Sequence, residues 1–120
     1  IFLSEKKLKK QIMGIKTDST PIEDPKDPDT CSVFTIYQLI ASPDQVSALR
    51  EKYLEGGMGY GNAKQELFEL ILKKFQAERK KFDYYYAHPE EVEVALAKGA
   101  IKASKVADKV LHRVRLKVGF

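Results

Sequence analysis

The sequence predicts an all-α protein, a helical bundle of about five to six helices with an N-terminal appendage helix. Apolar residues recur at helical spacing in several segments, and glycines and prolines separate those segments. Neither the alternation of a β-strand nor the turn of a hairpin occurs. With 120 residues, of which 43% are hydrophobic and 32% charged, the chain has the composition of a globular domain.

The first helix is expected over residues 5–15. Ser4 is a suitable N-cap, and Leu8, Ile12 and Ile15 follow at helical spacing. A connector then runs from residue 16 to residue 32. It holds three prolines, and residues 18–29 contain five acids and one lysine, a net charge of −4. Because proline disrupts helical geometry, we expect the boundary between the appendage and the main domain here.

Two short helices are expected next. The first ends near residue 41 and is marked by four apolar residues at helical spacing, namely Val33, Ile36, Tyr37 and Ile40. The second begins at Ser42, which can act as N-cap, with Pro43 in the first helical position and Gln45 placed to complete a capping box. It should stop at Gly56-Gly57, because glycine tolerates a left-handed cap.

A long amphipathic helix is the clearest pattern in the sequence. Its stripe steps by three or four residues through Leu67, Ile71, Phe75, Glu78, Phe82 and Tyr85, and it should end at His88-Pro89. A second stripe of smaller side chains follows, comprising Val92, Leu96, Gly99, Ala103, Ala107, Val110, Val114 and Val118. Large residues on one helix that face small ones on the other allow close packing, so we expect these two stripes to be buried together.

The C-terminal region carries a concentration of positive charge. Residues 98–120 hold seven cations and one anion, a net charge of +6, in a chain whose overall charge is +4. One helix face collects Lys98, Lys102, Lys105, Lys109 and His112. This face is either a solvated surface or a ridge that contacts phosphates of a nucleic acid.

A second cationic segment stands beside aromatic residues. Arg79-Lys80-Lys81 precedes Tyr84-Tyr85-Tyr86, and such rings can stack on unpaired bases. Phe82 and Tyr85 fit the buried stripe, so only Tyr84 or Tyr86 is expected to be free. A core or solvent role for these residues remains the alternative.

No catalytic or metal-binding set is predicted. His88, His112 and the single Cys31 are far apart in the sequence, which argues against a zinc site, and one cysteine cannot form an intrachain disulfide. Asp18 and Ser19 have the character of turn residues. No signal peptide or membrane-spanning run is expected, and a reducing cytoplasm is the natural compartment. The first residue, Ile1, indicates the cut end of a longer chain.

Several blocks, in their order and spacing, resemble bacterial tryptophanyl-tRNA synthetases. They are Ile15-Lys16-Thr17-Asp18-Ser19, Thr35-Ile36-Tyr37, Gly59-Tyr60-Gly61-Asn62-Ala63-Lys64, Glu78-Arg79-Lys80-Lys81-Phe82, Gly99-Ala100-Ile101-Lys102-Ala103 and Val114-Arg115-Leu116-Lys117-Val118-Gly119-Phe120. The resemblance covers essentially the whole chain and identifies it as a C-terminal piece of such an enzyme. The connector with three prolines is longer than in many relatives, which leaves the placement of residues 20–31 open.

This resemblance implies a class I aminoacyl-tRNA synthetase that uses ATP and Mg²⁺ to attach tryptophan to tRNA(Trp). Its HIGH-like and KMSKS-like motifs are absent here, so the chain alone is predicted to be inactive and to hold no cofactor. Residues 1–19 would be the tail of the catalytic region, 20–31 the connector and 32–120 the anticodon-binding domain. The implied partners are tRNA(Trp) and the catalytic domain of the same chain, with a parent homodimer formed through that domain.

The expected tRNA contacts are the cations Lys64, Arg79, Lys80, Lys98, Lys102, Lys105 and Lys109. Two alternatives remain. The first alternative is a helical protein–protein interaction module with a solvated basic face. The second is a small enzyme in its own right. The absence of a paired nucleophile and base in the sequence argues against the second alternative.

Overall fold

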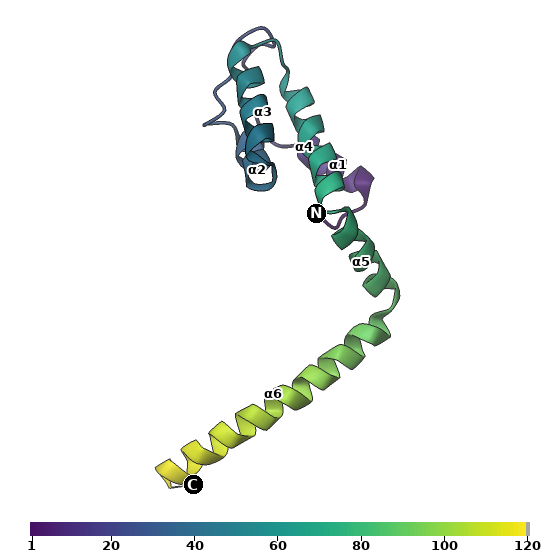
Figure 1. Ribbon diagram of the computed structural model, residues 1–120, viewed down its shortest axis with the longest axis vertical. Helices are drawn as coiled ribbons and strands as arrows, with labels where there is room; N and C mark the ends of the chain where they lie inside the picture. The colour runs from purple at the N-terminus through teal and green to yellow at the C-terminus, as the bar shows by residue number, and fades with distance from the viewer. Residues whose placement is uncertain (120) are drawn as a thin grey trace. The chain divides into compact units, whose positions relative to one another are not determined.

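The computed structural model describes residues 1–119 and contains six helices and no strand in that range (Figure 1). The predicted all-α class is therefore confirmed. The helices are α1 (Glu5–Met13), α2 (Ser32–Ile40), α3 (Pro43–Glu55), α4 (Tyr60–Lys74), α5 (Gln76–Ala87) and α6 (Pro89–Val118). The chain forms two compact units, residues 1–80 and the residues from Lys81 onward, with the boundary inside α5.

The first unit is a four-helix bundle organised around α4. This helix packs against α1 and α2, and α3 packs against α2 (Figure 1). Val33, Leu49, Tyr53 and Leu67 are almost inaccessible to solvent, and the ring of Tyr53 meets that of Phe34 edge-on at 5.4 Å. Each large side chain buried in this way contributes about 1.5–3 kcal/mol before conformational entropy is counted.

The helix predicted as an appendage packs within this bundle. Leu8 and Ile12 of α1 are buried, and the Nζ of Lys64 donates a hydrogen bond to the carbonyl oxygen of Met13 at 3.1 Å. Helix α1 ends at Met13, whereas the prediction extended it to residue 15. The predicted boundaries at residues 19 and 31 stay predictions.

The connector is ordered around one buried lysine. Lys26 is 2% exposed, and its Nζ donates to the carbonyl oxygens of Pro21, Ile22 and Asp24 at 2.8, 3.2 and 3.0 Å. Its backbone N–H also donates to the carbonyl oxygen of Tyr53 at 2.7 Å. The three carbonyl oxygens satisfy the ammonium group, which is what makes its burial tolerable.

The signals that predicted α3 are present in the structure. Ser42 and Gln45 form the capping box, with the Ser42 N–H donating to Gln45 Oε1 at 2.9 Å and the Gln45 N–H donating to Ser42 Oγ at 3.4 Å. Pro43 occupies the first turn. The helix ends at Glu55 with Gly56 as its C-cap, and both Gly56 and Gly57 have positive φ angles, 78° and 76°.

The long amphipathic helix predicted through Tyr85 is wrong in two respects. The chain leaves helical geometry at Phe75, with φ −103° and ψ 20°, so that α4 and α5 are separate helices. Phe82 and Tyr85, expected in the core, are 41% and 49% exposed. The stripe is buried at Leu67 and Ile71 and half-buried at Phe75, so burial of the apolar face ends where α4 ends.

Helix α6 begins at His88-Pro89 as predicted and runs for 30 residues. Its first turn carries Glu90 and Glu91 and its last turn Arg115 and Lys117, an arrangement that complements the helix dipole. Its described residues include no buried side chain, so the prediction that its small-residue stripe is buried is wrong. The second unit consists only of this helix and the end of α5, which cannot enclose a core.

Candidate nucleic-acid interface

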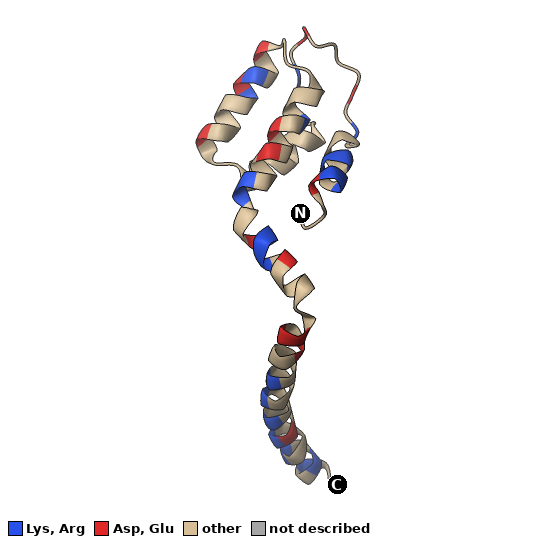
Figure 2. Cartoon of the chain, turned by 90° about the vertical axis from the view of Figure 1, so that its right-hand side faces the viewer, with Lys and Arg blue, Asp and Glu red and all other residues tan. Residues whose placement is uncertain are grey.

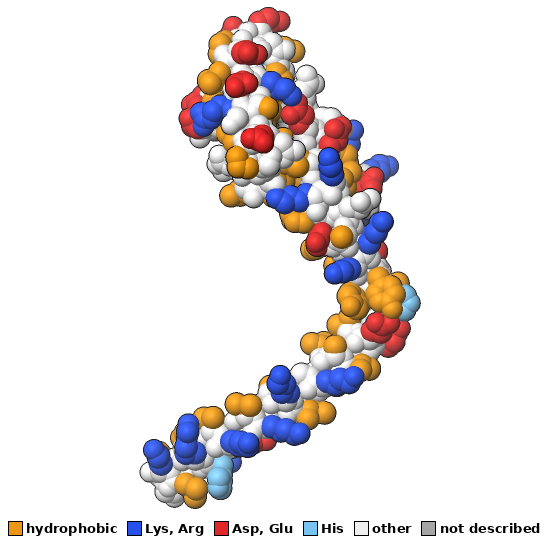
Figure 3. All heavy atoms as spheres, in the orientation of Figure 1, with side chains coloured by type: hydrophobic (Ala, Val, Ile, Leu, Met, Phe, Trp, Pro, Cys, Tyr) orange, Lys and Arg blue, Asp and Glu red, His pale blue; other side chains and the backbone are white. Residues whose placement is uncertain are grey.

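The basic face of α6 comprises Lys98, Lys102, Lys105 and Lys109. All four side chains are exposed. Blue segments recur along the helix in Figure 2, and blue side chains follow it in Figure 3. Within residues 1–119, none of the four makes a hydrogen bond or an ion pair. The two ion pairs in that range, Arg50–Asp29 and Lys52–Glu66, both lie in the first unit. At a rise of about 1.5 Å per residue the face is roughly 16 Å long. Four unneutralised ammonium groups in one row can contact successive phosphates.

The charge changes sign along α6. Red marks its first turns in Figure 2, where Glu90, Glu91 and Glu93 lie, and blue dominates the rest. A polyanion is therefore attracted to the C-terminal two thirds of the helix and repelled from its start.

Two of the predicted tRNA contacts have an internal role. Lys64 is bonded to the Met13 carbonyl, and the guanidinium of Arg79 donates to the carbonyl oxygen of Leu3 at 2.9 Å and also to that of Ile1. Both side chains attach the N-terminal segment to the bundle. Lys80 is exposed and has no hydrogen bond or ion pair among the described residues. The seven predicted residues therefore lie partly in the first unit and partly on α6, and their role in RNA binding stays a prediction.

The aromatic residues that follow Lys81 differ in their availability. Tyr84 donates a hydrogen bond to Glu91 Oε1 at 2.5 Å and stacks on His88 with ring centroids 4.4 Å apart. The hydrogen bond to the carboxylate raises the pKa of Tyr84. Tyr86 stacks on Phe82 at 6.0 Å and is 82% exposed. Of the two rings left open by the sequence, Tyr86 is therefore the better platform for an unpaired base.

A polar depression of about 270 Å³ lies beside the connector. Its lining includes Lys16, Asp18, Cys31 and Tyr60. The Thr20 N–H donates to Asp18 Oδ1 at 2.9 Å, which confirms the predicted turn. Hydrogen bonds from Thr20, and then one from Tyr60, lower the pKa of Asp18. Burial and the hydrogen bond to Asp18 raise the pKa of Tyr60 to about 12.

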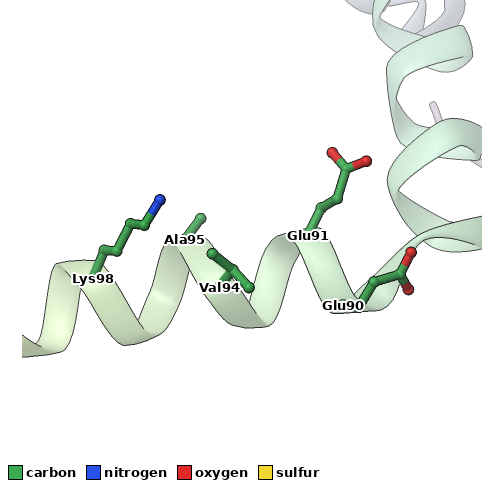
Figure 4. A pocket seen from close by; sticks show the side chains of 5 residues that line it. All are labelled: Glu90, Glu91, Val94, Ala95 and Lys98. Atoms are coloured by element: carbon green, nitrogen blue, oxygen red, sulfur yellow. The ribbon is translucent and has the colours of Figure 1, made fainter.

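A second depression, of about 390 Å³, is formed by α6 alone. Figure 4 shows its side chains, Glu90, Glu91, Val94, Ala95 and Lys98, arranged along the first turns of one helix. A single helix does not surround a small molecule, so this surface has no site for a buried substrate.

Metal-binding clusters and membrane-spanning helices are absent from the described residues. Residues 1–119 contain no group of three or more histidine, cysteine, aspartate or glutamate side chains placed to hold a metal ion. In the same range no helix is long and apolar enough to cross a bilayer.

Sequence reasoning missed two cations at the C-terminal end of α4. Lys73 and Lys74 border a depression between that end and the corner joining α2 to α3. Their local sequence is that of any lysine pair at a helix end. The other side of the depression comes from residues about 30 positions earlier in the chain, which lie beside these lysines only because the bundle packs α2 against α4.

Comparison with known proteins identifies relatives of this chain. No protein-family model matches it. It is 40% identical over 119 residues to the tryptophan–tRNA ligase of Campylobacter jejuni and 41% identical over 119 residues to that of Rhodopirellula baltica. Each match covers 99% of this chain and 37% of the relative.

Solved structures give the same result. The tryptophanyl-tRNA synthetase of C. jejuni superposes with a TM-score of 0.90 at 40% sequence identity, over 100% of this chain and 39% of that protein. A second structure of that enzyme, complexed with ADP and tryptophan, matches equally well. The chain spans little more than a third of the length of these relatives. Over its whole length the chain is therefore a homologue of part of a tryptophan–tRNA ligase.

Proposed function

We propose that this chain is the anticodon-recognising part of a tryptophan–tRNA ligase. The single observation that carries the proposal is the match to the C. jejuni enzyme, which extends over the entire chain at 40% identity and a TM-score of 0.90. The four unpaired lysines of α6 add a surface suited to the phosphates of an RNA stem. The chain would bind RNA, and bond formation would take place elsewhere in the enzyme.

The remaining parts of the reaction would belong to the rest of the ligase. That enzyme would activate tryptophan with ATP and Mg²⁺, transfer it to tRNA(Trp), and act in the cytoplasm as a homodimer formed through its catalytic domain. The present chain would contact both the tRNA and that catalytic domain. We expect no ATP–pyrophosphate exchange with tryptophan from these 120 residues alone.

Binding of a tRNA(Trp) transcript, measured by fluorescence anisotropy at several salt concentrations, tests the proposal. We expect affinity to fall with salt and to fall further when the anticodon is changed. Replacing Lys98, Lys102, Lys105 and Lys109 by glutamine should reduce the slope of log K against log salt by roughly 3, at about 0.7–0.9 per phosphate contact. Replacing the same four by arginine is the matched control, because it keeps the charge and should keep the slope.

Two outcomes would contradict the proposal. Equal affinity for tRNA(Trp) and for an unrelated polyanion would reduce the interaction to general electrostatics. An unchanged salt slope in the glutamine variant would show that the lysines of α6 do not contact RNA.

A protein–protein interaction module is the second candidate, and one observation favours it. Helix α6 exposes aliphatic side chains along its length, including Leu96 at 66% and Val106 at 63%. Exposed aliphatic surface of this kind is typical of protein contacts. Replacing these two residues by serine separates the functions, because it should leave tRNA binding unchanged and weaken any protein complex.

A further inference from the structure

We propose that the depression between the α2–α3 corner and the end of α4 binds one unpaired nucleotide of the RNA. The inference rests on the proposed function and deepens it, since it names a place where a splayed base would be held. The depression has a volume of about 420 Å³ and lies wholly within the first unit. That volume is within the range of small-molecule sites, about 300–1,000 Å³.

The floor of the depression is apolar. Ile40, Ala41 and Leu70 line it, and all three are partly buried against the bundle core. They come from the end of α2 and from the last turns of α4, two helices that pack together. A floor built from packed helices is preformed, and its aliphatic surface suits the flat face of a base.

The rim is cationic. Lys73 and Lys74 both line the depression, and no carboxylate does. Lys74 Nζ donates to the carbonyl oxygen of Ile40 at the end of α2, which holds this ammonium at the edge of the site. Lys73 is exposed and makes no hydrogen bond or ion pair among the described residues. Two adjacent positive groups beside an apolar floor favour a ligand with an anionic part and an apolar part.

One side-chain amide is available to read the base. Gln45 lines the depression, and the capping box uses its Oε1, which accepts the Ser42 N–H. Its Nε2 has no partner among the described residues, so two N–H donors remain. The capping box also fixes the Gln45 side chain, so these donors are positioned before a ligand arrives. A base offers ring nitrogen and carbonyl acceptors to such donors, whereas an acidic peptide offers no flat face for the floor.

The probe for the test is an RNA hairpin that carries the anticodon stem and loop of tRNA(Trp). Each loop position in turn holds the fluorescent base 2-aminopurine, and the protein is the full 120-residue chain. We expect the emission at one loop position to change when the chain binds, because that base leaves its stacked neighbours for the site.

Two variants address the site. Gln45→Glu keeps an Oε1 acceptor for the Ser42 N–H and thus the capping box, but removes the amide donors and adds a negative charge. We expect it to weaken hairpin binding roughly tenfold and to abolish the emission change. Lys73→Gln should lower the salt slope by about 0.7–0.9. Lys6→Gln is the matched control for Lys73→Gln, since Lys6 is an exposed lysine of α1 with no hydrogen bond or ion pair among the described residues. Its effect on binding should be below about twofold.

The outcomes separate the two proposals. If the hairpin binds the wild type and both site variants equally, the site is refuted and the proposed function stands. If the hairpin does not bind the wild type at all, the proposed function fails and this inference fails with it. If polyglutamate displaces the hairpin and is equally sensitive to Gln45→Glu, the depression is a general anion site and the nucleotide assignment is wrong.

Discussion

Replacing Gly56 by alanine is expected to destabilise the first unit far more than the same change at Gly57. Both glycines have positive φ angles, 78° and 76°, so a side chain at either position strains the backbone. They differ in their surroundings. A Cβ on Gly56 would lie 2.4 Å from the carbonyl oxygen of Glu23, whereas a Cβ on Gly57 would meet nothing within 4 Å.

The magnitudes follow from these two terms. A positive φ costs a non-glycine residue about 1–2 kcal/mol. At Gly56, where ψ is −172°, the positive φ falls in a region essentially limited to glycine, so that the backbone strain as a whole is about 1–3 kcal/mol. The clash at Gly56 is with backbone, which cannot rotate away as a side chain could, and overpacking of this kind adds about 1–3 kcal/mol. We expect about 2–6 kcal/mol for Gly56→Ala and about 1–2 kcal/mol for Gly57→Ala.

Urea unfolding checks this prediction, followed by far-ultraviolet circular dichroism and by the near-ultraviolet signal of the buried tyrosines. With a dependence of about 1–3 kcal/mol per molar urea, the midpoint of Gly56→Ala should lie roughly 1–2 M below that of Gly57→Ala. Equal midpoints for the two variants would refute the reasoning, because they would show that the connector does not press against Gly56.

Three further predictions concern the connector and its neighbours. Lys26→Met should destabilise the first unit by about 3 kcal/mol or more in the same urea assay, because three carbonyl oxygens lose a charged donor. Lys16→Met, at an exposed lysine, is the control and should change the free energy of unfolding little. Tyr60 should ionise near pH 12 in an absorbance titration at 295 nm. Because its folded pKa is raised above the ordinary tyrosine value of 10.0, its contribution to stability should be complete below pH 10 and lost as the pH rises toward 12. Ionisation near pH 10 in the folded protein would contradict this. Asp18 has a lowered pKa, so its contribution to stability should be present above the ordinary aspartate value of 3.8 and lost as the pH falls through the folded pKa. Asp18→Asn should remove this part of the acid dependence of stability, and an unchanged acid profile would refute the role of its hydrogen bonds.

The elements predicted correctly are those determined by local signals. The start of α3 depends on four consecutive residues, Ser42 to Gln45, and the structure contains the hydrogen bonds that these residues imply. The start of α6 at His88-Pro89 is of the same kind, because proline fits the first turn of a helix and not its interior. Such signals are complete within one turn of the chain and do not depend on the bundle.

The break at Phe75 could not be predicted in this way. The apolar period continues through it to Phe82 and Tyr85, so the sequence pattern is the same on both sides. The two sides differ in burial. Helices α1 and α2 cover the apolar face of α4, and the buried part of the stripe ends near Phe75. Periodicity reports which face of a helix is apolar, but only the tertiary structure decides where that face is covered.

Charged residues were the least predictable part of the candidate site. Lys64 bonds to a carbonyl 51 positions earlier in the sequence, and Arg79 to one 76 positions earlier. Lys26 entered the sequence analysis only as the one lysine of the acidic connector, and the structure buries it to 2% exposure. Lysine and arginine side chains are long enough to reach whichever acceptor the fold places nearby. Because that acceptor can be distant in the sequence, the local sequence does not identify it.

The one thiol of the chain has a practical consequence. Cys31 is 7% exposed, and its Sγ lies 3.4 Å from the hydroxyl of Tyr53 in the centre of the bundle. Although Cys31 borders the polar depression beside the connector, so little of it is exposed that an alkylating reagent should react slowly until the surrounding segments separate, and the rate of modification then reports how often they do. The thiol of Cys31 therefore reports local opening without an added label. RNA that binds only the closed bundle would slow the alkylation of Cys31, and at a fixed excess of RNA the slowing would grow with its affinity.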